Sequence, residues 1–195
     1  VDGVGDMHGE VRNVRKAFEK AGKTIAAMQE LQKKYRFNFG ISSTIFSKNL
    51  EDADNILAWA KKEKLDIVFN MVRFTDAMLG NQELEGTLKP MGAEEQRMRQ
   101  FFMERVRQDP LLDGQNYIYM HYADMIANGY HRTAPCPFQT QGVMLNPNGD
   151  LFFCENSEIM GNVTQEDAEA IYFRDTSQAH RREISCRDLE LHLVD

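Results

Sequence analysis

The sequence lacks any run of about 18 uninterrupted apolar residues, which is the length that an α-helix needs to cross a bilayer. Its first residues, Val1, Asp2 and Gly3, do not show the basic and then apolar character of a signal peptide. Internal repeats and low-complexity segments are missing as well. We therefore expect a cytoplasmic protein that does not enter a membrane, with one large or two small domains in 195 residues.

Positive charge is also scarce. The chain has 23 Lys and Arg against 30 Asp and Glu, which gives a net charge of −7. Because the neutralisation of phosphates needs a basic face, this balance disfavours a general role in nucleic-acid binding. We expect the partner to be a small molecule or a peptide.

Cysteine is limited to Cys136, Cys154 and Cys186. In a reducing compartment, so few cysteines are more often buried thiols than disulfides. A metal site is the alternative, because Cys136 precedes Pro137 in an expected loop and Cys154 ends an expected hairpin strand. Zinc and iron–sulfur clusters usually take four ligands, so three cysteines leave one position to be filled. The spacing alone leaves both interpretations open.

The first half of the chain alternates between helical and strand patterns. Apolar residues recur at steps of three and four from Val11 to Leu31, which predicts one long helix ending near Tyr35. Residues 37–46 and 65–72 read as strands, and a helix is expected between them. This alternation is typical of βα units in a parallel sheet. Val1 reads as the end of a further strand, so we expect that an N-terminal part of the parent protein is missing and that the sheet has an open edge.

The second half changes character. Residues 75–92 read as a long loop, and residues 93–108 and 116–128 as helices. Two short apolar runs surround Asn-Pro-Asn-Gly at residues 146–149, which predicts a β-hairpin because Asn and Gly tolerate a positive φ. A helix and a charged run follow over residues 165–182. We therefore divide the chain into domains at 1–129 and 130–195.

The residues around this hairpin resemble a known motif. Twelve residues separate Cys136 from Gly149, and four separate Gly149 from Cys154. This is similar to the pattern that opens the auxiliary-cluster domain of radical S-adenosylmethionine (SAM) enzymes, which is called SPASM, or twitch when shortened. Gly161-Asn162 also resembles the Gly-Asn that commonly follows the hairpin in this family.

A second resemblance lies at the other end of the chain. Val1-Asp2-Gly3, followed by His8 and Arg12, is similar to a strand end found midway through the radical SAM barrel. Together, the two resemblances imply an α/β fold in which residues 1–129 form part of a TIM-like (β/α) barrel. They imply that residues 130–195 form a SPASM or twitch domain.

The resemblance also implies a function. The parent protein would be a radical SAM oxidoreductase-type enzyme that uses a 5′-deoxyadenosyl radical to modify a peptide or small-molecule substrate. Its cofactors would be S-adenosylmethionine and [4Fe–4S] clusters, and its electron donor a protein such as flavodoxin or ferredoxin. The auxiliary cluster would be bound by Cys136, Cys154 and Cys186.

The sequence departs from the family at two places. It contains no Cys-x-x-x-Cys-x-x-Cys loop for the catalytic cluster, so this fragment alone is expected to be inactive. Leu189 also stands where the family usually has a further cysteine. The fourth ligand would then be His180, His192, Asp188, a residue beyond Asp195 or the substrate, and absence of the cluster is the alternative.

Other polar residues are candidates for ligand contact. Asn49 and Arg73 follow the two expected strands, where the mouth of a barrel gathers ligand-binding groups, and the resemblance adds Arg12 as a partner for the SAM carboxylate. We predict that these three residues bind cofactor, with loop capping or simple surface exposure as the alternative. Weaker candidates are Thr44, Asn70, His8, His121 and His131, and the cluster Tyr117, Tyr119, Tyr122 and Tyr130 is expected to be a packing surface. The alternative function is a non-catalytic peptide-binding module with a zinc or vestigial cluster site.

Overall fold

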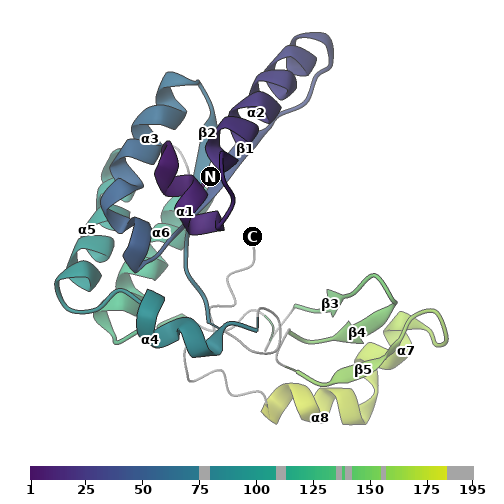
Figure 1. The fold of residues 1–195 in the computed structure, drawn as a ribbon. Coiled ribbons are helices and arrows are strands. Elements are labelled where there is room, and N and C mark those ends of the chain that lie inside the picture. Colours follow the sequence, from purple (N-terminus) through teal and green to yellow (C-terminus); the bar gives the residue numbers. More distant parts are fainter. Residues whose placement is uncertain (75–79, 109–112, 135–137, 139–141, 155–156, 184–195) are drawn as a thin grey trace. The chain divides into compact units, whose positions relative to one another are not determined.

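The structure is a computed structural model that describes residues 1–74, 80–108, 113–134, 138, 142–154 and 157–183 (Figure 1). The chain divides into two compact units, which are treated separately below. Unit 1 comprises Val1–Val72 and Leu84–Asn116, and unit 2 comprises Arg73–Glu83 and Tyr117–Asp195. The expected boundary at residues 129 and 130 falls inside unit 2, and the domain assignment built on it stays a prediction.

Unit 1 contains the predicted parallel βα unit. Strands β1 (Gly40–Ile45) and β2 (Asp66–Met71) pair in parallel, in a register that runs from Gly40 opposite Asp66 to Ile45 opposite Met71. The 3-10 helix η1 (Ser47–Asp52) and helix α3 (Ala53–Lys62) connect them. The prediction of a parallel pair joined by a helix is confirmed.

The N-terminal helix is broken, which the sequence did not predict. It forms α1 (Asp6–Arg12) and α2 (Ala17–Lys34), which are separated by a short turn. Asn13 and Lys16 adopt left-handed φ values of 50° and 60° in this turn, so a continuous helix cannot pass through it. The prediction of a strand at Val1 is wrong. Val1 instead contacts the side of β1 through a hydrogen bond from its amino group to the Ser42 carbonyl (2.6 Å).

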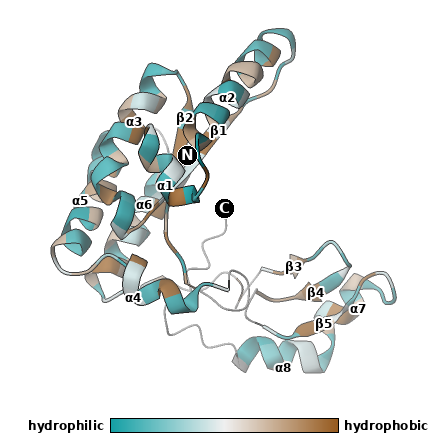
Figure 2. Cartoon of the chain, viewed as in Figure 1, coloured by the Kyte–Doolittle hydropathy of each residue, from teal (hydrophilic) through white to brown (hydrophobic). Residues whose placement is uncertain are grey.

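The core of unit 1 lies on the two strands. Phe69 of β2 meets Phe101 of α5 (Ala93–Gln108) edge to face, with 4.9 Å between the ring centroids. Ile25 of α2, Ala60 of α3 and Leu65 form a second buried cluster. In Figure 2, hydrophobic colour is visible along β2, whereas much of α8 in unit 2 is hydrophilic. Burial of apolar side chains against these strands is therefore what stabilises the βα unit.

The segment after β2 contains more helix than expected. The predicted loop over residues 75–92 includes η2 (Gln82–Leu84) and the short α4 (Glu85–Leu88) in its described part. Helix α5 has the predicted bounds, and α6 (Asp113–Ala127) begins three residues earlier than predicted. Among the described helices, none combines the length and the apolar character needed to cross a membrane.

Unit 2 contains the predicted hairpin and one strand that was not predicted. Strands β3 (Met144–Leu145) and β4 (Asp150–Phe152) are antiparallel, and β5 (Ile159–Asn162) adds to β4. Helices α7 (Ala168–Phe173) and α8 (Asp175–Glu183) follow. The described sheets have two and three strands and close no barrel, so the fold shown is mixed α/β.

The hairpin turn is built by its asparagines. The Asn146 side-chain oxygen accepts hydrogen bonds from the backbone N–H groups of Asn148 (2.9 Å) and Asp150 (3.0 Å), and Gly149 takes a φ of 89°. Asn162 of β5 donates to the Asn148 carbonyl (3.0 Å) and to the Asp150 carboxylate (2.8 Å). The Asn146 amide nitrogen also donates to the Asp150 carboxylate (2.9 Å), and this bond, followed by the one from Asn162, lowers the pKa of Asp150. The third strand therefore fastens the turn of the first two.

Two glycines of unit 1 provide a test of how closely β1 and β2 approach each other. A Cβ at Gly40 would lie 2.7 Å from the Asp66 carbonyl oxygen, whereas a Cβ at Gly22 in α2 meets nothing within 4 Å. We expect Gly40→Ala to lower the free energy of unfolding by about 1–3 kcal/mol, because the strands must move apart. Gly22→Ala, the matched control, should raise it by about 0.5–1 kcal/mol. Urea unfolding of both variants measures the difference, and equal effects would contradict the close approach of β1 and β2.

Candidate functional site

The Asp2 carboxylate is the centre of a buried polar network in unit 1. Its side chain is 3% exposed. One oxygen accepts the Nε and one Nη of Arg12, at 2.7 and 2.6 Å, and the other accepts the backbone N–H of Thr44 at 2.9 Å. The carboxylate thus joins α1 to the end of β1 and satisfies a backbone donor there. The sequence analysis named Asp2 in a motif but gave it no role.

The backbone of Asp2 is held on both sides. Its N–H donates to Nδ1 of His8 (3.0 Å), and its carbonyl accepts from the Asn49 amide (3.0 Å). Since Nδ1 of His8 acts as an acceptor, it carries no proton in this arrangement. Burial is the main cause that lowers the pKa of His8 below its usual 6.5. The network therefore requires a neutral His8.

Asn49 lies fully buried at the start of the connection between the strands. Its oxygen accepts from the Phe46 N–H (2.9 Å), and its amide nitrogen also donates to the Thr44 carbonyl (2.8 Å). Three backbone groups from two segments thus depend on one side chain. In this structure Asn49 holds the end of β1 in place, and its assignment to a cofactor stays a prediction.

Arg12 combines an internal contact with an accessible side chain. It is 58% exposed even though it contacts the buried Asp2. A guanidinium has five N–H donors, so donors remain beyond the two nitrogens that contact Asp2. Lys48 lies close to the same helix and donates to the Glu10 carbonyl (3.4 Å). The structure therefore brings Arg12 and Asn49 together around Asp2, in an arrangement that leaves Arg12 able to contact a carboxylate.

Two further candidate residues, Asn70 and Arg73, lie on β2 and shortly after it. Asn70 pairs in register with Thr44 and donates to the Ser42 hydroxyl (2.9 Å). Arg73 follows β2, and its carbonyl accepts from the Asn81 amide (2.9 Å). Arg73 is assigned to unit 2, whereas Arg12 and Asn49 are assigned to unit 1. The cofactor contact of Arg73 stays a prediction.

His121 on α6 is a buried imidazole in unit 2. It stacks on Tyr117, with centroids 6.5 Å apart and an interplanar angle of 6°. Within the described part of the chain its Nε2 is buried without a hydrogen-bond partner. Burial lowers its pKa, and the charge of Arg132 lowers it further. Of the four tyrosines expected to pack, three are buried, whereas Tyr117 is exposed.

Cys154 is the one predicted metal ligand whose position is described. It is buried two residues after the end of β4, where the Ser157 hydroxyl accepts from the N–H groups of Phe153 (3.0 Å) and Cys154 (3.1 Å). Cys136 and Cys186 lie outside the described residues. Within the described ranges no group of three or more His, Cys, Asp or Glu side chains could hold a metal ion. Convergence of the three sulfurs therefore stays a prediction.

His180 was one of the possible fourth ligands. Its ring stacks on Phe153, the residue before Cys154, with 6.4 Å between centroids and an angle of 23°. Its Nε2 is buried and has no partner among the described residues. It also lines a pocket of about 350 Å³ between β5 and α8, together with Glu158 and Ser177.

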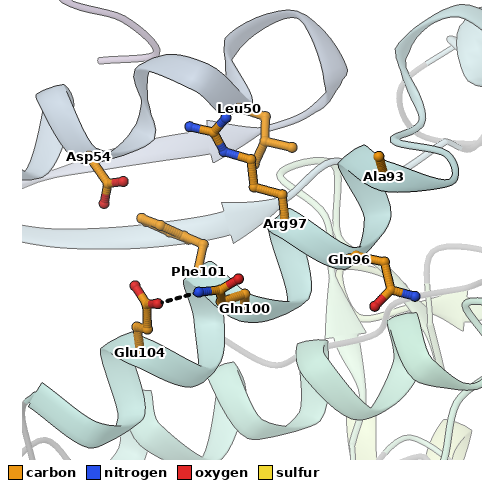
Figure 3. Close-up of a pocket in the computed structure, with 8 residues that line it drawn as sticks. All are labelled: Leu50, Asp54, Ala93, Gln96, Arg97, Gln100, Phe101 and Glu104. Atoms are coloured by element: carbon orange, nitrogen blue, oxygen red, sulfur yellow. Dashed lines mark hydrogen bonds between the residues drawn. The ribbon is translucent and has the colours of Figure 1, made fainter.

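A second pocket lies in unit 1 (Figure 3). It has a volume of about 480 Å³ and lies between η1, α3 and α5. Leu50 and Phe101 supply its apolar surface, and Glu104 accepts a hydrogen bond from Gln100 (2.8 Å). Its Arg97 is paired with Glu51. The sequence analysis singled out none of these residues as ligand-binding, because their spacing matches that of an ordinary helix surface.

Comparison of the chain with protein-family models, with curated proteins and with solved structures finds no match.

Replacement of Asn49 tests the network. We expect Asn49→Ala to lower the free energy of unfolding by roughly 3 kcal/mol, because it leaves buried backbone groups unpaired. Asn55→Ala removes an exposed asparagine that bonds only Asp52 (2.7 Å) and serves as the matched control, with a change within about 0.5 kcal/mol. If urea unfolding shows the same loss of unfolding free energy for both variants, the hydrogen bonds of Asn49 stabilise the fold no more than that of Asn55.

The protonation of His8 gives a prediction about pH. A lowered pKa in the folded state means that the unfolded chain binds a proton first as the pH falls below 6.5, so stability is lost on acidification. His8→Asn keeps an acceptor for the Asp2 N–H but does not titrate. We expect unfolding curves from about pH 8 to about pH 5 to show a smaller loss for this variant. His121 also lowers the stability at acidic pH, and it does so in the wild type and in His8→Asn alike. At about pH 8 the wild type and His8→Asn should be similarly stable.

Proposed function

We propose that this chain is part of a radical SAM enzyme and carries its auxiliary-cluster domain. The observation that carries the proposal is the geometry of the hairpin that leads to Cys154. Four residues separate Gly149 from the next cysteine, and Gly149 occupies a turn with φ 89°, a conformation that favours glycine. Asn162 then fastens this turn. Two residues of the resemblance, Gly149 and Asn162, thus have a physical role in one small structure.

The environment of Cys154 suits a thiolate ligand. The residue is buried at a strand end, and its backbone is fixed by Ser157, whose hydroxyl also donates to the Cys154 carbonyl (2.9 Å). A ligand held on a fixed backbone needs little rearrangement to bind a metal centre. Cys136 and Cys186 would complete the cysteine ligands of a [4Fe–4S] cluster, and His180 is a candidate for the fourth position.

The Asp2 network supports the SAM-binding part of the proposal. It lies at the carboxyl end of β1, which is the end at which parallel α/β folds bind ligands. Arg12 is oriented there by a buried carboxylate and retains exposed donors, so it fits the carboxylate of SAM. The chemistry supplied by SAM at a reduced cluster is the abstraction of a hydrogen atom from a substrate. Asp2 would keep the guanidinium in position for that ligand, and Asn49 would keep the strand end in position for Asp2.

The remaining parts of the proposal concern residues and partners beyond this chain. The cysteine loop for the catalytic cluster and further strands of a (β/α) barrel would be supplied by the parent protein. The substrate would be a peptide or a small molecule, and a flavodoxin or ferredoxin would deliver electrons in the cytoplasm. An acidic chain with a net charge of −7 is consistent with the absence of a nucleic-acid partner from this proposal.

Metal analysis tests the proposal. After anaerobic reconstitution with iron and sulfide, we expect about four iron and about four sulfide per chain, the content of one [4Fe–4S] cluster. Cys154→Ser should lose most of both, because serine does not replace a thiolate ligand. Leu145→Ala changes an exposed residue of the same hairpin and should keep the wild-type content. A folded wild-type chain that binds no iron, or that binds zinc without sulfide, would favour a non-catalytic module instead.

A further inference from the structure

Arg181 on α8 is a buried arginine in unit 2. The residue is 6% exposed, although most arginines lie at the surface. Its Nε donates to the Phe138 carbonyl (3.2 Å), and one Nη donates to the Gly142 carbonyl (3.3 Å). The other Nη donates to the Tyr172 hydroxyl. All three guanidinium nitrogens are therefore used inside the unit.

The guanidinium also lies against two aromatic rings. Its Cζ is 4.9 Å from the centroid of the Phe153 ring and 5.1 Å from that of Tyr172. Contacts of this kind are attractive and become stronger where water is excluded. Phe153 is itself fully buried, so this contact lies in the core of the unit.

No carboxylate accompanies this buried cation in the described part of the chain. The buried Asp2 carboxylate is paired with Arg12 at 2.6 Å, and the exposed Arg174 of unit 2 is paired with Glu166. Among the described residues, Arg181 instead has carbonyl, hydroxyl and ring partners. Burial of a charge without an opposite charge costs free energy, so we expect an anion near such a residue.

The partners of Arg181 belong to the segments that flank the cysteine motif. Phe138 and Gly142 precede the hairpin, with Phe138 two residues after Cys136 in the sequence, and Phe153 directly precedes Cys154. A Cβ at Gly142 would lie 2.2 Å from a carbon of the Phe138 ring, so these two residues are in close contact. One guanidinium thus ties the entry of the hairpin to its exit.

We propose that Arg181 is a positioning residue that clamps both ends of the hairpin and supplies positive charge beside an anionic metal centre bound through Cys154. This inference rests on the proposed function, because that function provides the anion. The clamp combines hydrogen bonds at the entry of the hairpin with the contact to the Phe153 ring at its exit, whereas the charge effect requires only a cation. Two substitutions separate these contributions.

Arg181→Met removes the charge and the fork of donors but retains an apolar chain. Arg181→Lys retains the charge with a single donor nitrogen. The matched control is Arg182→Met, which removes the same charge from an exposed neighbour that bonds the Gln178 carbonyl (3.0 Å). Thermal unfolding of each metal-free chain identifies variants that fold, and only these are compared.

The reconstituted chains are then compared by two measurements besides activity. The first is the rate at which a chelator removes iron, and the second is the reduction potential of the cluster. We expect Arg181→Met to lose iron about 10-fold faster and to have a more negative potential, because a nearby positive charge favours the added electron. Arg181→Lys should recover the potential but not the resistance to the chelator. Arg182→Met should match the wild type in both.

The outcomes separate the two proposals. If wild-type chain forms a cluster and both Arg181 variants keep its potential and its iron, the role of Arg181 is refuted while the proposed function stands. If Arg182→Met shifts the potential as much as Arg181→Met, overall charge is the cause and the positioning role fails. If the folded wild-type chain forms no cluster, both the function and the inference are overturned.

Discussion

The buried carboxylate of Asp2 is the interaction on which the end of the βα unit depends. It accepts from Arg12 of α1 and from the Thr44 N–H of β1, while its own backbone contacts His8 and Asn49. A carboxylate with 3% exposure is stable only with such partners. The site proposed for SAM is therefore a consequence of a structural need, since the same ion pair that neutralises Asp2 also orients Arg12.

In unit 2 a cation, Arg181, is buried without a carboxylate partner among the described residues. This cation is surrounded by carbonyl groups and aromatic rings. The buried His121 and the half-buried His180 each have a buried Nε2 without a partner among the described residues. Buried polar atoms without a partner lower the stability of a folded chain. The proposal of a bound anionic centre gives a physical reason for Arg181, and it makes His180 a natural candidate for a further contact.

The sequence predicted elements well wherever local signals mark both of their ends. Helix α5 begins after Gly92, which has φ 59°, and ends before Pro110 in the sequence, so its bounds were correct. The break between α1 and α2 was missed because the three-four spacing of apolar residues continues across a four-residue turn. Strand β5 was missed because four residues with a glycine carry little alternation.

The candidate site was predicted less completely than the fold. Asn49 and Arg12 were identified as polar groups near a strand end, but spacing could not show that both contact Asp2. The contact between Asn49 and Asp2 joins residues 47 positions apart, and Arg181 reaches Gly142 over 39 positions. Periodicity describes neighbours along a helix or strand, so contacts at such separations are not encoded in it.

The network around Asp2 recognises its partners mainly through backbone atoms. The side chains of Asp2 and Asn49 bind backbone N–H and carbonyl groups of Thr44 and Phe46, and the His8 side chain accepts the backbone N–H of Asp2. We therefore expect an uneven pattern of variation among related chains. The residue types at positions 44 and 46 can vary as far as packing permits. Those at positions 2, 8 and 49 should be substituted only together or not at all.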